Sequence, residues 1–361
     1  HASTALRRGL LFLVLGVVGL LWFVSDREEV NTNEKAEPYF ADSDTSSTSK
    51  YAVIIDAQSP NASLHIHKFT SDGQYLSTFL PAGTDSLDSL FRIASTIVPS
   101  SQIPCTPFLV RVSDTREIEE TEALVAALPF DVSDDGVDAM QEGEEAALTW
   151  LATGYRMGEL GIVLLTLNEG DTEIVLAPGP VLDSEEFRKY KHELWVADER
   201  YLLYQRTFAG NGLRFLSQRV SGDQTFDDST TTVDIVLAET FHNVAFPPIY
   251  AATPVVLTGY FVDVLEPLLR PVLDTTEDGL LITTVDRLSA LIRAECAEAD
   301  PQPRECLNLM IVYRLLRTGY RLESSQEVTI LAPSLGASSV ADPDWTLGAA
   351  LKLVLDRHRR C

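Results

Sequence analysis

Two parts of the chain share a pattern that restricts the fold: a short apolar run, a polar turn and a second apolar segment. The first spans residues 51–55 and 64–69, and the second spans residues 162–167 and 173–176. Short, continuous apolar runs are typical of strands buried on both faces, and a polar turn between two such segments predicts a β-hairpin. We therefore predict two β-hairpins in the folded part of the chain.

Segments with helical spacing of apolar residues lie between and around these strands. Residues 87–98, 117–128 and 142–157 have this spacing, and residues 108–112 form another strand-like run. Strands that alternate with helices are typical of α/β layers. The composition of 45% hydrophobic and 22% charged residues agrees with a globular head.

The N-terminal region has the features of a membrane anchor followed by a spacer. Residues 9–24 are apolar and uncharged, follow Arg7 and Arg8, and end in Trp22 and Phe23. We predict an uncleaved transmembrane segment with residues 1–8 in the cytoplasm and the remainder in the lumen; a cleaved signal peptide is the alternative. Residues 25–50 are polar and without periodicity, which predicts a flexible stem.

The charge of the chain excludes one class of function. It has 28 Lys and Arg against 53 Asp and Glu, a net charge of −25. Nucleic-acid binders neutralise phosphates with a basic face, so we expect no nucleic-acid partner. The acidic run at 131–145 is interpreted as solvated surface.

The two hairpins suggest a phosphate site. Asp56 ends the first buried strand, and the turns at 56–63 and 166–173 could face each other and grip a polyphosphate with backbone N–H groups. A carboxylate at the start of the helix between them could orient and deprotonate a water molecule. Glu144 and Glu145 are in position for that role.

Several segments resemble known motifs in the order in which they occur. Residues 51–65 (YAVIIDAQSPNASLH) resemble the first apyrase motif, residues 143–158 the third, and residues 161–178 the fourth. Segments around Gln205, Tyr260, Cys306 and Trp345 resemble later motifs. Over about residues 51–355 the chain therefore resembles the apyrase and guanosine-diphosphatase family of secretory-pathway nucleotidases, and the Golgi branch is the nearer likeness.

The resemblance implies a two-lobed, actin-like (ribonuclease H-like) α/β fold with a nucleotide cleft. The lobes are expected at 51–178 and 179–361, with the final segment returning to the cleft. The implied function is a luminal nucleoside diphosphate phosphohydrolase that converts GDP or UDP to the monophosphate, uses Ca²⁺ or Mg²⁺ and supports glycosylation. Its implied location is a Golgi or other secretory membrane, as a single-pass type II protein, and its ligands are nucleoside di- or triphosphates.

The resemblance also implies roles for individual residues. Glu145 would activate water, Ser59 would contact the terminal phosphate, and Asp56 would hold metal-bound waters. The remaining implied residues contact phosphate (Gly170, Asp171, Thr172), lie near the nucleoside (Tyr260, Trp345), or form a disulfide (Cys296, Cys306). Asn61 begins an N-glycosylation signal. His65 and His67 alternate on one strand, and we expect packing or hydrogen bonding there rather than a metal pair.

Both phosphate turns depart from the family pattern. Gln58 and Asn61 replace glycines in the first turn, and Asn168 and Glu169 replace glycines in the second. Glycine lets the backbone approach phosphate closely, and a carboxylate repels it. These changes leave two alternatives open. One is an impaired family member that binds nucleotide or a protein partner without turnover, and the other is an anchored head whose fold is merely structural.

Overall fold

The computed structural model describes residues 49–58, 62–81, 86–220, 226–276, 279–297, 303–331 and 343–356. The expected tail and anchor, nearly all of the expected stem, and both Ser59 and Asn61 lie outside these ranges. Within the described ranges, none of the helices is both long and apolar enough to cross a bilayer.

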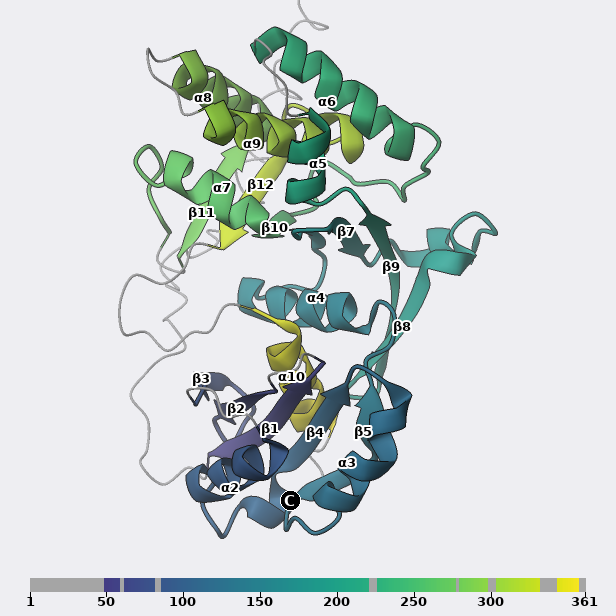
Figure 1. Ribbon diagram of the computed structural model, residues 1–361, viewed down its shortest axis with the longest axis vertical. Helices are drawn as coiled ribbons and strands as arrows, with labels where there is room; N and C mark the ends of the chain where they lie inside the picture. Colours follow the sequence, from purple (N-terminus) through teal and green to yellow (C-terminus); the bar gives the residue numbers. More distant parts are fainter. Residues whose placement is uncertain are drawn as a thin grey trace, which may run out of the picture. The chain divides into compact units, whose positions relative to one another are not determined.

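The first sheet contains the first predicted hairpin. Its strand order is β3-β2-β1-β4-β5 (Figure 1). Strands β1 and β2 are antiparallel, as are β2 and β3, whereas β1, β4 and β5 run parallel. The bounds are β1 (Lys50–Ala57), β2 (Ser63–Phe69), β3 (Tyr75–Phe79), β4 (Pro107–Val112) and β5 (Asp131–Ala139).

The second sheet contains the second predicted hairpin. Its order is β11-β12-β10-β6-β7-β9-β8. Strands β6 and β7 are antiparallel, as are β7 and β9, whereas β6, β10 and β12 run parallel. The bounds are β6 (Val163–Leu167), β7 (Asp171–Leu176), β8 (Lys191–Val196), β9 (Glu199–Ala209), β10 (Val255–Gly259), β11 (Leu280–Thr284) and β12 (Glu327–Leu331).

The two sheets repeat one topology. Strands β5-β4-β1-β2-β3 correspond in order and direction to β12-β10-β6-β7-β9. In each sheet the first strand of the hairpin has a parallel neighbour on its other side. The two hairpin turns therefore occupy equivalent positions at the carboxyl ends of β1 and β6.

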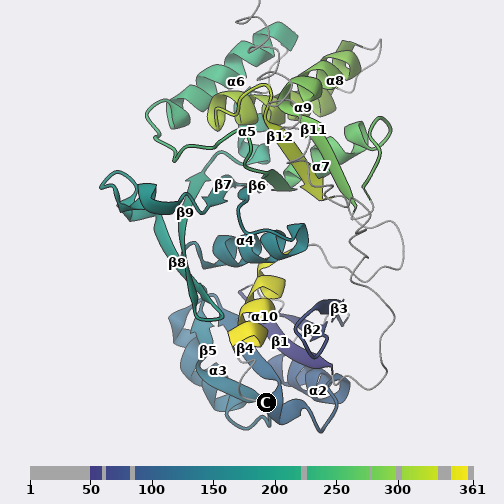
Figure 2. The same cartoon turned by 180° about the vertical axis from the view of Figure 1, so that it is seen from behind.

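Helices surround the sheets and separate them. Their bounds are α2 (Leu87–Ile97), α3 (Ile118–Val125), α4 (Glu144–Met157), α5 (Leu213–Val220), α6 (Phe226–Phe241), α7 (Tyr260–Leu269), α8 (Val285–Ala297), α9 (Pro303–Arg314) and α10 (Trp345–Asp356). Figures 1 and 2 both show α4 between the two sheets and α10 beside β1.

Helices α4 and α10 form a core that both sheets share. One buried cluster includes Ile54 of β1, Trp150 of α4, Leu164 of β6 and Leu351 of α10. The α10 backbone touches α4 directly, because a Cβ atom on Gly348 would lie 2.0 Å from the Leu148 carbonyl oxygen. Burial of this shared apolar surface holds the last described helix against the first sheet.

The structure confirms most predicted elements and corrects two expectations. Residues 131–139 form strand β5 instead of solvated surface. The predicted helix at 117–128 is shorter, with a 3₁₀ turn at 115–117 followed by α3. Strands β6 and β7 belong to the second sheet, and α4 lies between the last strand of the first sheet and β6 in the chain.

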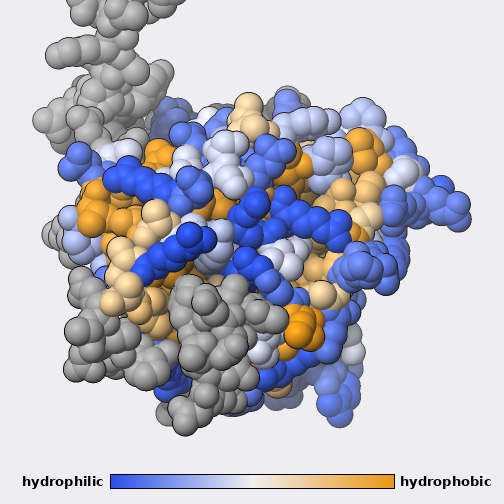
Figure 3. All heavy atoms as spheres, turned by 90° about the horizontal axis from the view of Figure 1, so that it is seen from above, coloured by the Kyte–Doolittle hydropathy of each residue, from blue (hydrophilic) through white to orange (hydrophobic). Residues whose placement is uncertain are grey.

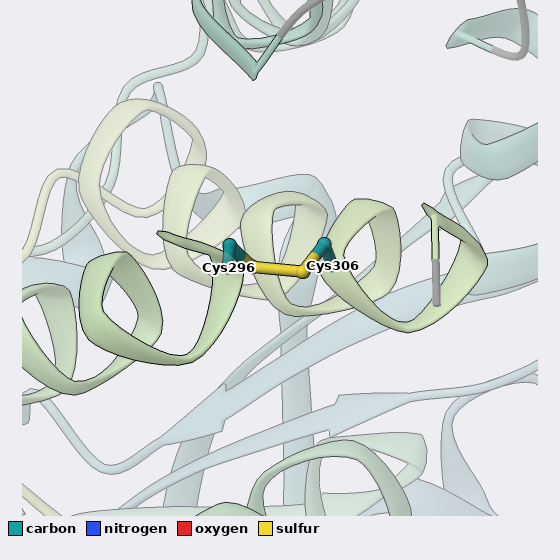
Figure 4. The surroundings of a disulfide bond; sticks show 2 residues. All are labelled: Cys296 and Cys306. Atoms are coloured by element: carbon teal, nitrogen blue, oxygen red, sulfur yellow. A yellow bond between two sulfur atoms is a disulfide. The ribbon is translucent and has the colours of Figure 1, made fainter. Parts of the chain in front are cut away.

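The disulfide implied by the resemblance is present. Cys296 near the end of α8 bonds Cys306 of α9, with their Cα atoms 5.6 Å apart (Figure 4). Cys105 is also disulfide-bonded. On the molecular face shown in Figure 3, hydrophilic side chains are interspersed with small apolar areas.

Candidate functional site

Carboxylates from both sheets influence Glu145 in the first turn of α4. Burial raises the pKa of Glu145 most, and repulsion from Glu173, Asp56, Asp171 and Asp344 raises it further. Asp56 ends β1, whereas Asp171 and Glu173 lie on β7. Both hairpins are therefore within electrostatic range of Glu145, which is the relation expected from the sequence.

Neighbouring Glu144 has a different environment. Arg111 of β4 donates to Glu144 Oε1 from Nε at 3.1 Å and from Nη2 at 3.0 Å. The Gln141 N–H donates to Glu144 Oε2 at 3.1 Å. Arg111 is only 7% exposed, so this ion pair is largely screened from water. Glu144 is thus bound in a structural pair, whereas Glu145 as a whole residue remains exposed to solvent, although the protein atoms around its carboxyl group are enough to raise its pKa.

Gln205 and Thr207 of β9 connect the start of α4 to β7. Gly143 precedes the helix at φ +80°, and a Cβ atom there would lie 2.8 Å from Gln205 Oε1. Gln205 Nε2 donates to Thr207 Oγ1 at 3.0 Å, which donates to Glu173 Oε1 at 2.8 Å. Burial and then repulsion from Asp171 raise the pKa of Glu173, and the Thr207 hydrogen bond opposes that rise.

The turn between β6 and β7 is held from one side by its backbone carbonyls. Leu213 N–H donates to Asn168 O at 3.0 Å, and Arg214 N–H donates to Glu169 O at 3.2 Å. In a trans peptide the following N–H points opposite to the carbonyl. The N–H groups of Glu169 and Gly170 therefore point away from residues 210–214, and successive N–H groups of this kind can bind an anion.

The side chains of this turn are partly engaged within the protein. Asn168 Nδ2 donates to Asp171 Oδ1 at 2.8 Å. Thr172 is fully buried, and its hydroxyl donates to Thr166 O at 2.8 Å and lies 2.7 Å from the Tyr320 hydroxyl. The Thr172 side chain is therefore unavailable to a phosphate.

The two expected nucleoside contacts differ in exposure. Tyr260 is 37% exposed and begins α7 directly after Gly259. A Cβ atom on Gly259 would lie 2.4 Å from Leu167 O, so this helix start is packed against the end of β6. Trp345 is only 5% exposed and belongs to the core shared by the sheets, which leaves little of its ring for a nucleoside.

The two histidines of β2 have hydrogen-bonding roles. His67 is 1% exposed, and burial followed by repulsion from His65 lowers the pKa of His67 to about 3. Each ring contacts the Thr346 hydroxyl, His65 at 3.1 Å and His67 at 3.2 Å. Among the described residues, no group of three or more His, Cys, Asp or Glu side chains is arranged to hold a metal ion directly.

Residues that the sequence interpretation missed carry recognisable signals. Arg111 is a charged residue within an otherwise apolar strand, and a buried charge requires a partner. Asp344 precedes α10, and its Oδ1 accepts the Leu347 N–H at 2.9 Å as a helix cap. Gln205 lies in a segment that matched a family motif, but its contact with the α4 start depends on the assembled fold.

Solved structures share the overall fold. A nucleoside triphosphate hydrolase from Neospora caninum superimposes with a TM-score of 0.54 at 11% identity, covering 87% of this chain and 94% of that chain. The Aquifex aeolicus member of the Ppx/GppA protein family gives a TM-score of 0.50 at 13% identity, covering 85% and 98%. These likenesses establish an α/β fold of the type found in these two proteins.

Proteins with similar sequences indicate more narrowly which class of protein the chain resembles. No protein-family model matches the chain. The guanosine-diphosphatase of Saccharomyces cerevisiae is 30% identical over 226 residues, covering 50% of this chain and 44% of that protein. The guanosine-diphosphatase of Candida albicans is 28% identical, covering 45% and 33%. Ectonucleoside triphosphate diphosphohydrolase 5 of Ailuropoda melanoleuca is 23% identical, covering 47% of each.

The comparisons confirm the resemblance to the apyrase and guanosine-diphosphatase family. The chain spans less than half of the length of these three relatives.

Proposed function

We propose that the chain is a nucleoside diphosphate phosphohydrolase that converts GDP or UDP and water to the nucleoside monophosphate and phosphate. The observation that carries this proposal is the position of Glu145 between two topologically equivalent hairpins, with carboxylates of both raising its pKa. The likeness to guanosine-diphosphatases supports the substrate class.

Glu145 acts as the general base in this proposal. A carboxylate with a raised pKa holds a proton more tightly than an ordinary glutamate, and a base is most effective when its pKa approaches the working pH. Its exposed side chain can accept a proton from a water molecule that attacks the terminal phosphorus. The Glu169 and Gly170 N–H groups bind oxygens of the phosphate.

A divalent cation, Ca²⁺ or Mg²⁺, is part of the proposal. The charged groups that raise the pKa of Glu145 are all carboxylates, and they favour a cation over a bare phosphate. Two unit charges 4 Å apart repel by about 4 kcal/mol at an effective dielectric of 20. The described side chains fit a hydrated ion, held through water at Asp56, better than direct coordination by several side chains. When bound, the ion neutralises phosphate charge.

The cellular setting belongs to the same proposal. We place the head in the lumen of the Golgi or another secretory compartment, anchored by residues 9–24, with a role in glycosylation and with Asn61 as a glycan acceptor. The alternative is a protein that binds nucleotide or a protein partner without turnover. The carboxylates of Glu169 and Asp171 on the phosphate turn support that alternative.

Phosphate release by the full chain tests the proposal. We expect metal-dependent release from GDP or UDP, and a loss of about 10²- to 10⁴-fold in Glu145→Gln, the usual contribution of a general base. Glu142→Gln is the matched control, because Glu142 is an exposed carboxylate just before the helix and should leave turnover unchanged.

Two other outcomes of this experiment would lead to different conclusions. A rise in melting temperature with GDP and no turnover would support the non-hydrolysing alternative. If GDP and UDP cause neither turnover nor stabilisation, both nucleotide functions are wrong.

A further inference from the structure

A buried hydrogen bond closes the base of the turn between β6 and β7. Thr166 of β6 and Thr172 of β7 flank this turn, and the Thr172 hydroxyl donates to the Thr166 carbonyl oxygen at 2.8 Å. The Thr172 residue is fully buried, so water does not compete for this bond. The loop closed in this way carries Glu169 and Gly170, whose N–H groups are assigned to phosphate oxygens in the proposed function.

Tyr320 reaches the same hydroxyl from a distant part of the chain. Its hydroxyl oxygen lies 2.7 Å from Thr172 Oγ1 and 3.2 Å from the Glu173 carbonyl oxygen. A threonine hydroxyl has one proton, and Thr172 uses it in the bond to Thr166. Tyr320 is therefore the donor to Thr172 Oγ1. Through this one contact its hydroxyl is connected to both strands of the hairpin.

The Tyr320 side chain is itself held in place. It is only 2% exposed, and its ring packs against those of three phenylalanines, with centroids 5.7–6.3 Å apart: Phe208, Phe241 and Phe246. Burial raises the pKa of Tyr320, so the hydroxyl keeps the proton that it donates. The hydroxyl is thus a fixed donor on a packed aromatic support.

A local irregularity of the backbone positions this side chain. The Tyr320 N–H donates to the Leu315 carbonyl oxygen at 2.8 Å, which closes a π-helical turn over Leu315–Gly319 directly after α9. Single π-helical turns are rare and are frequently found at functional sites. An ordinary α-helical continuation would place residue 320 differently around the helix axis, because successive residues are rotated by a fixed angle.

The tie lies next to two groups that the proposed reaction uses. The first is the pair of N–H groups in the turn. The second is Glu173, whose backbone contacts Tyr320 and whose carboxylate is within electrostatic range of Glu145. Thr207 of β9 holds that carboxylate at 2.8 Å. A shift at the base of the turn would therefore displace both the phosphate-binding N–H groups and the carboxylate beside Glu145.

We propose that Tyr320 is a positioning residue whose hydroxyl, acting through Thr172, holds the turn so that the terminal phosphate meets the water activated by Glu145. This role rests on the proposed function. Tyr320 is buried and does not itself contact the nucleotide. Misplacement of a reacting group by 1 Å can cost about 10²-fold in rate. Loss of the tie should therefore impair turnover more than binding.

The first test compares variants that remove single hydroxyl groups. In Tyr320→Phe, hydrolysis of GDP by the full chain with Mg²⁺ should have a kcat about 10- to 10²-fold lower and a KM within about threefold of wild type, because the turn still supplies its N–H groups but no longer aligns them. Thr172→Val should have the same effect. Thr172→Ser returns the hydroxyl and should retain most of the wild-type kcat.

Tyr204→Phe is the matched control. Tyr204 is also fully buried in the same hydrophobic cluster, but its hydroxyl donates to the Ala245 carbonyl oxygen at 3.4 Å. It pairs with Leu176, at the end of β7 farther from the turn. We expect this variant to keep the wild-type kcat. A melting curve for each variant shows whether it is folded.

Two further measurements test how Tyr320 acts. The double variant Tyr320→Phe/Thr172→Val should lose no more kcat than either single variant, because both substitutions remove the same tie. Hydrogen exchange followed by mass spectrometry needs no substrate. A peptide that covers residues 166–173 should exchange faster in Tyr320→Phe than in Tyr204→Phe.

The outcomes separate this inference from the proposed function. GDP hydrolysis with the wild-type kcat in a folded Tyr320→Phe variant overturns the inference and leaves the proposed function intact. An equal loss of kcat in Tyr204→Phe, or additive losses in the double variant, also overturns the inference. If the wild type does not hydrolyse GDP, the proposed function is wrong. Faster exchange at the turn in Tyr320→Phe would then still support the tie, and equal exchange in both variants would overturn it.

Discussion

Glu144 and Glu145 are adjacent in sequence but differ in electrostatic environment. The guanidinium of Arg111 compensates Glu144, and the pair is partly shielded from water, with side-chain exposures of 9% for Arg111 and 21% for Glu144. The charged groups that shift the pKa of Glu145 are all carboxylates. Glu144 therefore stabilises the junction of α4 with the first sheet, and Glu145 is available for the proposed proton transfer.

The environment of the single residue Glu173 predicts how the stability of the protein depends on pH. Burial and then Asp171 raise the pKa of Glu173, so its contribution to stability is complete below the unfolded pKa of about 4.3 and is lost as pH rises through the folded pKa. Glu173→Gln cannot ionise but can still accept the Thr207 hydrogen bond. We expect this variant to melt at a higher temperature than wild type at pH 8, with the difference disappearing toward pH 4. A difference that does not change with pH would contradict this account.

The turn between β6 and β7 is the element on which the proposed binding of phosphate depends most. Its carbonyls accept hydrogen bonds from Gly210 and from the first two residues of α5, and the chain approaches the turn closely at Gly212. A Cβ atom there would lie 2.4 Å from both Asp171 N and Glu169 O, which are backbone atoms that cannot move independently.

Gly212→Ala should therefore displace the turn. We expect it to reduce the free energy of unfolding by about 1–3 kcal/mol, as overpacking does, and to weaken GDP binding. Urea denaturation and a GDP titration measure the two effects. Gly161→Ala is the control, because a Cβ atom at Gly161 meets nothing within 4 Å. Equal results for both variants would show that the close approach is unimportant.

The sequence predicted the elements better than their assembly. The apolar runs at 51–55 and 162–167 correspond to strands because both faces of each strand are buried. Strand β5 was missed because its sequence DVSDDGVDA resembles a solvated acidic run, although it pairs with β4 in the sheet. A hairpin pattern is local and does not reveal which sheet it joins, so the sequence did not show that β6 and β7 belong to the second sheet.

At the candidate site, too, the sequence identified residues but did not reveal their contacts with distant segments. Glu145 and Asp56 were identified from short motifs, and the fold brings the carboxylate of Asp56 within electrostatic range of Glu145. Thr172 was assigned to phosphate, but its hydroxyl faces Tyr320, a residue 148 positions away in sequence. Asp344 also approaches this site from the far end of the chain. Such contacts between distant segments have no local sequence signature.

For the whole molecule, the repeated topology makes α4 and α10 the joint between two equivalent sheets. Gly348 allows their backbones to touch, since a Cβ atom there would lie 2.0 Å from Leu148 O. We expect Gly348→Ala to reduce the free energy of unfolding by about 3 kcal/mol or more and to reduce turnover, because the helices must separate. Urea denaturation and the phosphate assay measure both. A variant as stable as wild type would contradict the proposed close contact.

The position of α10 also has a consequence during synthesis. Strand β1 ends at Ala57, but the helix that packs against it begins only at Trp345. On the ribosome, apolar side chains such as Ala52 and Ile54 therefore lack their final covering until α10 has been synthesised. Nascent chains truncated before residue 345 should therefore recruit chaperones and be cut readily by proteases.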